Sequence, residues 1–172
     1  MKIRRATERD IPLLAELFTA SVRGLAAGSY DKAQLDAWAP VPPDVAQWRT
    51  RLASLETLVA DRNGSMAGFI AFRNDGHIAL LYTAPAHARA GVATALYGEA
   101  VSRLRERGVG TLFAEASVAA RPFFERMGFR VVEEERVERN RVGLIRFLMR
   151  TEDARPPAQE AAPRGIGQEE RS

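Results

Sequence analysis

The residues best suited to chemistry lie in one loop between an apolar run and an amphipathic segment. The run over residues 80–83 leads through Pro85 to a loop that carries Arg89 and Gly91, and residues 92–94 open a segment with helical periodicity. Backbone N–H groups at the start of a helix bind anions, and pyrophosphate is a common one. The sequence therefore predicts a site for a phosphate-bearing ligand at this loop.

Two other glycine-loop chemistries do not fit the chain. The mononucleotide P-loop ends in Gly-Lys followed by Ser or Thr, and no glycine here precedes a lysine. The dinucleotide fingerprint needs three glycines at the opening of a helix. Gly108 and Gly110 lack the third glycine and follow a predicted helix instead of opening one. The loop over residues 88–93 is what remains.

The periodicity along the chain predicts a mixed α/β fold. Asn63-Gly64 and Asp75-Gly76 favour tight hairpin turns, so the three strands around them form an antiparallel meander. A helix joins the third of these strands to the next one, which implies a parallel crossover. We expect strands at 2–6, 58–60, 69–72, 78–82, 111–116, 129–132 and 144–148, and helices after Thr7 and at 31–38, 44–55, 91–107 and 119–127, lying on both faces of the sheet.

Composition limits the class of protein. The 172 residues suit one domain, expected over 1–151, and residues 152–172, which are rich in Pro, Ala and charge, are expected to form a mobile tail. The absence of cysteine excludes disulfides, thiolate zinc sites and a cysteine nucleophile, and two histidines give no metal-ligand spacing. The net charge of +3 comes from arginines interleaved with acids, which argues against nucleic acid as a partner. No apolar run is long enough to span a membrane, and we expect a cytoplasmic protein.

Two sequence blocks resemble the GNAT superfamily of acetyl-CoA-dependent N-acetyltransferases. Tyr82-Thr83, Pro85 and Gly91-x-Ala93 match the family's cofactor loop, although the basic residue is shifted to Arg89. Residues 117–129, ending in Gly-Phe, are similar to its closing motif. The resemblance covers roughly residues 2–150, and residues 29–40 and 135–138 resemble its YafP-type branch.

The resemblance implies a fold and a donor site. The fold is a mixed, mostly antiparallel sheet of six to seven strands, with helices on both faces and a splay between strands four and five. The co-substrate is acetyl-CoA, with its pantetheine arm along the fourth strand and its pyrophosphate at the loop. The residues expected to bind it are Leu81, Tyr82, Thr83, Arg89, Ala90, Gly91, Val92, Ala93, Thr94, Ser117 and Phe124. For Ser117, a helix cap is the alternative role.

The expected reaction is direct attack of an amine on the thioester. Many relatives protonate the departing thiolate with a tyrosine, but the matching residue here is Phe124. Because an ordinary thiol has a pKa of about 8.5, a water or another hydroxyl, with Tyr82 as a candidate, suffices as the acid. Glu115 is the candidate base, with a strand-end charge in solvent or paired with an arginine as the alternative. His77 is a second candidate, with a surface histidine after a turn as the alternative.

The acceptor is expected to be a small-molecule amine. Tyr30 and Trp38 flank a short predicted helix and are candidates for lining a pocket for an apolar or aromatic amine, with core packing as the alternative. No metal, nucleic acid or membrane is expected to take part, and a homodimer is an option for assembly. The alternative functions are a CoA-binding module with little turnover, since Phe124 removes the usual acid, and transfer of another acyl group or to a protein acceptor.

Overall fold

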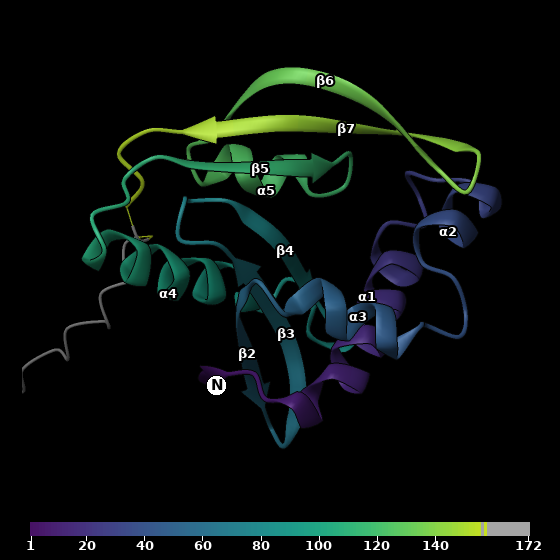
Figure 1. Ribbon diagram of the computed structural model, residues 1–172, viewed down its shortest axis with the longest axis horizontal. Coiled ribbons are helices and arrows are strands. Elements are labelled where there is room, and N and C mark those ends of the chain that lie inside the picture. Colours follow the sequence, from purple (N-terminus) through teal and green to yellow (C-terminus); the bar gives the residue numbers. More distant parts are fainter. Residues whose placement is uncertain (156, 158–172) are drawn as a thin grey trace, which may run out of the picture.

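The computed structural model describes residues 1–155 and residue 157 (Figure 1). This part of the chain contains seven strands, five α-helices and two short 3₁₀ helices. In order they are β1 (Lys2–Arg5), η1 (Glu8–Asp10), α1 (Ile11–Leu25), α2 (Lys32–Trp38), α3 (Val45–Leu52), β2 (Glu56–Arg62), β3 (Ser65–Phe72), β4 (Ile78–Thr83), η2 (Pro85–His87), α4 (Val92–Glu106), β5 (Leu112–Ser117), α5 (Arg121–Arg126), β6 (Arg130–Arg139) and β7 (Val142–Thr151).

The strands form two sheets that meet at a single point. β1, β2, β3 and β4 pair antiparallel in that order, and β5, β7 and β6 form the second sheet, also antiparallel. Among the described residues, one parallel bridge between His77 and Phe113 joins them. The predicted mixed, mostly antiparallel fold of six to seven strands is thus confirmed, with its seven strands divided between two sheets. The splay between β4 and β5 is confirmed too, and the expected parallel pairing of these strands is reduced to the one bridge.

A glycine fixes the point from which the splay opens. The Phe113 N–H donates to the Gly76 carbonyl at 3.1 Å. Gly76 has φ +95°, and a Cβ there would lie 2.3 Å from the Thr111 carbonyl oxygen. Only glycine fits both the left-handed backbone and this close approach. The Asp75-Gly76 turn therefore ends the β3–β4 hairpin and also joins the two sheets.

Helices cover both faces of the sheets, and each face has its own hydrophobic core. α4 and α5 cover one core, which includes Leu58, Ile70, Leu96 and Leu112. α1 and α3 cover the other, where Phe18, Trp48 and Phe69 pack together (Figure 1). Tyr97 is 1% exposed and packs between Phe123 and Phe129. Trp48, at 7% exposed, and Tyr97 are therefore core residues.

The last hairpin is longer than the sequence indicated. β6 and β7 each run for ten residues and pair from Arg130–Arg150 to Arg139–Val142. The expected strand ended at Val132 because residues 133–136 are all charged. β6 is an edge strand whose side chains are largely exposed, so charge is compatible with pairing there.

The predicted mobile tail falls largely on residue 156 and residues 158–172, outside the described residues. The described start of that segment packs onto the domain. Ala154 is 3% exposed, its N–H donates to the Gly110 carbonyl at 2.9 Å, and its carbonyl accepts a 2.6 Å bond from Arg105. None of the described helices is long and apolar enough to cross a membrane.

An ion pair ties the first strand to the first helix. Arg4 Nη1 and Nη2 donate to the two carboxylate oxygens of Asp10 at 2.8 and 3.0 Å, and the Thr7 N–H donates to the same carboxylate at 2.7 Å. Chiefly through Arg4, these bonds lower the pKa of Asp10 from 3.8 to about 2. A carboxyl with a lowered folded-state pKa stabilises the fold above its unfolded pKa, and this stability is lost as the pH falls through the folded value.

We predict that Asp10→Asn lowers the free energy of unfolding at pH 7 by about 2 kcal/mol, the value of this pKa shift. Urea denaturation at several pH values measures it, and the difference from the unaltered protein should shrink between pH 4 and pH 2. Glu8→Gln is the control, because its bond to Arg49 joins side chains that are 74% and 54% exposed. It should cost less than about 1 kcal/mol. A pH-independent effect of Asp10→Asn would contradict this account.

Candidate active site

The predicted anion loop lies at the start of α4. Gly91 is the residue before the helix and has φ 77°, and Arg89 also has a positive φ of 57°. The Ala95 N–H donates to the Gly91 carbonyl at 3.0 Å, the first bond of the helix. The N–H groups of residues 92–94 precede any intrahelical acceptor and point out of the helix start. Arg89, Ala90 and Gly91 are exposed, so this anion-attracting end is open to a ligand.

Contacts from the β2–β3 hairpin hold the loop in place. Arg62 Nη1 donates to the Ala90 carbonyl at 3.4 Å, and the Ser65 hydroxyl lies 3.2 Å from His87 Nε2. Gly68 on β3 permits the close approach of α4, because a Cβ there would lie 2.8 Å from Val92 Cγ1. The start of the helix is therefore fixed directly against the sheet, beside β4 (Figure 1).

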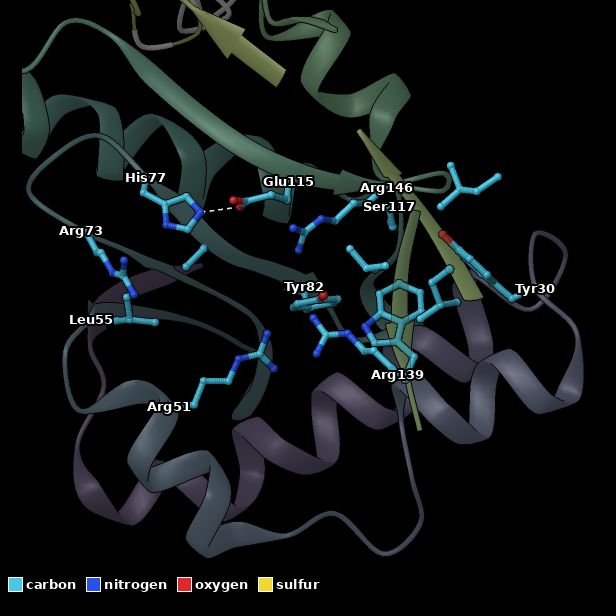
Figure 2. Close-up of a pocket in the computed structure, with 15 residues that line it drawn as sticks. Tyr30, Arg51, Leu55, Arg73, His77, Tyr82, Glu115, Ser117, Arg139 and Arg146 are labelled. Atoms are coloured by element: carbon cyan, nitrogen blue, oxygen red, sulfur yellow. Dashed lines mark hydrogen bonds and ion pairs between the residues drawn. The ribbon is translucent and has the colours of Figure 1, made fainter. Parts of the chain in front are cut away.

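On the α1 and α3 side of the splay there is a cavity of about 300 Å³ (Figure 2). β4, β5, β6 and β7 contribute to its walls together with α2 and α3. Its lining residues are Tyr30, Trp38, Arg51, Leu55, Arg73, His77, Ala79, Tyr82, Glu115, Ser117, Val137, Arg139, Leu144, Ile145 and Arg146. Six residues singled out from the sequence as acceptor-binding, catalytic or cofactor-binding are thus brought together: Tyr30, Trp38, His77, Tyr82, Glu115 and Ser117.

The two candidate bases form one hydrogen-bonded pair. His77 Nε2 lies 2.5 Å from Glu115 Oε2 (Figure 2). This bond, more than any other contact, lowers the pKa of Glu115 below its usual 4.5, and burial opposes it. Glu115 is therefore an ionised acceptor at neutral pH, so the His77 Nε2–H is the donor. The His77 ring also stacks on Phe113, with the centroids 4.8 Å apart. Glu115 is thus a strand-end carboxylate paired with His77.

Tyr82 brings a phenol into the same cavity from β4. Its ring packs edge-on against Phe18 at 4.8 Å and beside Phe69 at 5.8 Å. Burial raises the pKa of Tyr82 to about 12, against the opposing charges of Arg51 and Arg139. The phenol therefore stays protonated throughout the neutral range and acts as a hydrogen-bond donor.

Tyr30 and Trp38 form the wall next to α2. Their rings meet edge to face with centroids 5.1 Å apart, and the Tyr30 hydroxyl accepts the Val118 N–H at 2.9 Å. Both residues thus pack against neighbours and also line the cavity, so packing and lining a pocket do not exclude each other. The Ser117 hydroxyl lines the cavity too, while it accepts the Ala120 N–H at 3.1 Å in the turn before α5.

Phe124 lies on the other side of the sheet from this cavity. It is 5% exposed, and its ring contacts those of Phe123 and Phe129 at 5.5 and 5.0 Å. It belongs to the core under α4, together with the half-buried Leu81. The loop before α4, Leu81 and Phe124 thus lie toward one face of β4, and the aromatic cavity lies toward the other.

The sequence analysis missed the arginines of the cavity. Arg51 follows Trp48 by three residues in α3, so helical periodicity places it on the same face and was a usable signal. Arg139 and Arg146 come from the β6–β7 hairpin, and no local pattern indicated that this hairpin closes the cavity. In the described part of the chain, no group of three or more histidines and acids is arranged to hold a metal ion.

Comparison with known proteins agrees with this geometry. A family model described as an acetyltransferase (GNAT) domain matches residues 26–151. The uncharacterized N-acetyltransferase YafP of Escherichia coli is 34% identical over 150 residues, which cover 87% of this chain and 95% of that protein.

Solved structures show the same fold. A GCN5-related N-acetyltransferase from Rhodopseudomonas palustris, also described as a class-II aminotransferase, superposes with a TM-score of 0.83 at 29% identity, covering 88% of this chain and 94% of that one. YncA of Salmonella typhimurium, a putative acetyltransferase solved with its cofactor acetyl-CoA, gives 0.62 at 19% identity, covering 96% and 99%.

A splayed α/β sheet with a helix start beside the splay is the architecture of an acetyltransferase. The chain belongs to the GNAT family of acetyltransferases, and it is similar to the YafP-type branch. The predicted fold and enzyme class are thereby confirmed.

We predict that Gly91→Glu abolishes coenzyme A binding, because it puts bulk and negative charge where phosphate approaches the start of α4. Calorimetric titration with coenzyme A should show a loss of at least about a hundredfold, the order expected when a charge-assisted contact becomes a repulsion.

Gly108→Glu is the matched control. Gly108 also has a positive φ, +82°, and open space at its Cβ, but it lies at the other end of α4. The two variants share the backbone strain and the added charge, so equal coenzyme A affinities would refute the assignment of the loop.

Proposed function

We propose that this acetyltransferase moves the acetyl group of acetyl-CoA to the amine of a small molecule by direct attack on the thioester. The observation that carries the proposal is the splay between β4 and β5, which has the anion loop on one side and the Glu115–His77 pair on the other. A donor that enters from the loop and an acceptor that enters from the cavity meet at this gap.

The donor is held mainly by backbone. The pantetheine arm lies along residues 81–83 of β4, on the edge that faces β5 and is not paired with it. An N–H of this edge polarises the thioester carbonyl. The pyrophosphate lies at residues 89–94, where Arg89 adds charge to the helix start. Ser117 and Phe124 border the arm from β5 and α5. YncA, whose fold this chain shares, holds acetyl-CoA, which supports this donor.

The reaction removes one proton from the amine and adds one proton to the departing thiolate. The amine nitrogen bonds to the carbonyl carbon, the carbon–sulfur bond breaks, and coenzyme A leaves as the thiolate. The attacking nitrogen gives its proton to the Glu115–His77 pair. Since Glu115 stays ionised, the proton comes to rest as an imidazolium beside a carboxylate.

The thiolate needs no acid in the cavity, because a free thiol has a pKa of about 8.5 and its thiolate is a tolerable leaving group near neutrality. It takes up a proton from bulk solvent after it leaves, and the imidazolium returns its own proton to solvent, so the two proton transfers balance. Burial raises the pKa of Tyr82 to about 12. Tyr82 therefore donates a hydrogen bond and keeps its proton. Phe124, which stands where many relatives have a tyrosine, has no proton to give.

A binding module without turnover is the second candidate, and Phe124 is the residue that favours it. Incubation with acetyl-CoA and a panel of amines, followed by detection of released thiol, separates the two functions. Acceptor-dependent thiol release with a matching N-acetyl product supports the enzyme. Tight coenzyme A binding with no thiol release for any acceptor supports the module.

We predict that Glu115→Gln lowers kcat by up to about 10²–10⁴-fold, the usual contribution of general acid–base catalysis by a group such as the His77–Glu115 pair, and leaves the KM for acetyl-CoA unchanged. The amide keeps the shape of the side chain but cannot stabilise the imidazolium. Steady-state kinetics from pH 5 to 9 measure the change, and the acid limb of the wild-type profile should move in the variant.

Glu125→Gln is the control, because Glu125 is also paired, at 2.6 Å with Arg121, but lies on the exposed side of α5. It should leave kcat and the pH profile unaltered. If Glu115→Gln has the same kcat as this control, the proton leaves by another route.

A further inference from the structure

Positive charge is concentrated in the acceptor cavity. Four arginines line it, Arg51, Arg73, Arg139 and Arg146, against the single carboxylate of Glu115. Arg146 is neutralised by Glu135, with Nε 2.6 Å from Oε2. Among the described residues, no carboxylate forms an ion pair with the other three arginines. The cavity therefore has more cations than anions.

Arg51 is held in the cavity by aromatic rings. Its guanidinium carbon lies 5.1 Å from the centroid of Trp48 and 5.9 Å from that of Phe18. Burial lowers the pKa of Arg51, and the nearby charge of Arg139 lowers it further. Two like charges that line one cavity repel each other, and an anion between them would remove that cost.

The two arginines stand where two cavities join. A second cavity, of about 330 Å³, continues toward the start of α3, and Trp38, Arg51 and Arg139 line both. Figure 2 shows Arg51 reaching in from α3 and Arg139 from the hairpin, converging beside the Tyr82 phenol. Two guanidinium forks and a protonated phenol at one place form a set of donors for a carboxylate or phosphate group.

We propose that the acceptor is a small amine that also carries an anionic group, a carboxylate or a phosphate, which Arg51 and Arg139 hold between them. The amine then extends past Tyr82 toward Glu115 and the splay. This inference rests on the proposed function and deepens it, since it names the chemical class of the acceptor. The cavity volumes fit a small molecule, and the aromatic wall of Tyr30 and Trp38 covers its apolar part.

The test compares acceptors that differ only in the anionic group. Benzylamine, 4-(aminomethyl)benzoate and 4-(aminomethyl)phenylphosphonate form an aromatic set, and butylamine and 5-aminopentanoate form an aliphatic pair. We expect kcat/KM to be at least about tenfold higher for the anionic members, the effect of one charge-assisted hydrogen bond. Comparison of carboxylate with phosphonate identifies which anion the site takes.

The variants are Arg51→Gln and Arg139→Gln, each of which keeps a polar side chain without the charge. Each should reduce the preference for anionic acceptors by about tenfold or more, because the KM of the anionic member rises by much more than the KM of the neutral amine. Arg130→Gln is the matched control, because Arg130 lies at the other end of β6 and its side chain is 72% exposed. Equal losses for neutral and anionic acceptors would show a structural role and overturn the inference.

Binding without turnover separates this inference from the proposed function. Calorimetry with 4-(aminomethyl)benzoate in the presence of coenzyme A, which has no acetyl group to give, measures recognition alone. Arg51-dependent binding without acetyl transfer in the assay would refute the proposed function and support the anion site. Transfer to neutral amines with no preference for anionic ones would support the proposed function and overturn the anion site. If neither neutral nor anionic amines bind, the inference is overturned.

Discussion

The site depends on the point where the two sheets touch. The bond from the Phe113 N–H to the Gly76 carbonyl holds the two sheets together at the closed end of the splay. The Thr111 carbonyl lies so close to Gly76 that no side chain fits there. Beyond this point the right-handed twist of each sheet carries β4 and β5 apart. A continuous ladder between β4 and β5 would use the backbone groups of β4 that the proposed donor needs, so the proposed function requires this gap.

The same point positions the proposed proton acceptor. His77 is the residue after Gly76, and Glu115 follows Phe113 by two, so both lie directly beside the bridge. Because side chains alternate along a strand, Glu115 lies on the same face of β5 as Phe113, on which the His77 ring stacks. One backbone contact thus brings together two side chains that are 38 residues apart in the sequence.

Much of the fold followed from local signals, because turns and caps depend on few residues. Asn63, Gly64, Gly76 and Gly91 adopt positive φ values, as the turn pairs and the loop favour. β4 was expected at nearly the right bounds, whereas β3 begins at Ser65, four residues earlier than expected. The extent of β6 was missed because its charges are allowed only by its edge position, which is a tertiary fact.

The candidate site also has one part that local sequence signals predicted and one part that depends on tertiary structure. The anion loop is continuous in sequence and was therefore visible in the pattern of residues. The cavity is built from α2, α3, β4, β5 and the last hairpin, and its composition depends on how the hairpin folds over the sheet. Arg139 illustrates this dependence, since only the path of β6 brings it opposite Arg51, 88 positions earlier in the numbering.

The two faces of β4 have a consequence for the diversification of such enzymes. The proposed donor side relies on backbone and one helix start, whereas the cavity side relies on side chains from α2, α3 and the β6–β7 hairpin. Substitutions in these three elements alter the shape and charge of the cavity and leave the loop before α4 untouched. A duplicated gene can therefore change its acceptor by drift in the peripheral elements while the acetyl donor stays constant.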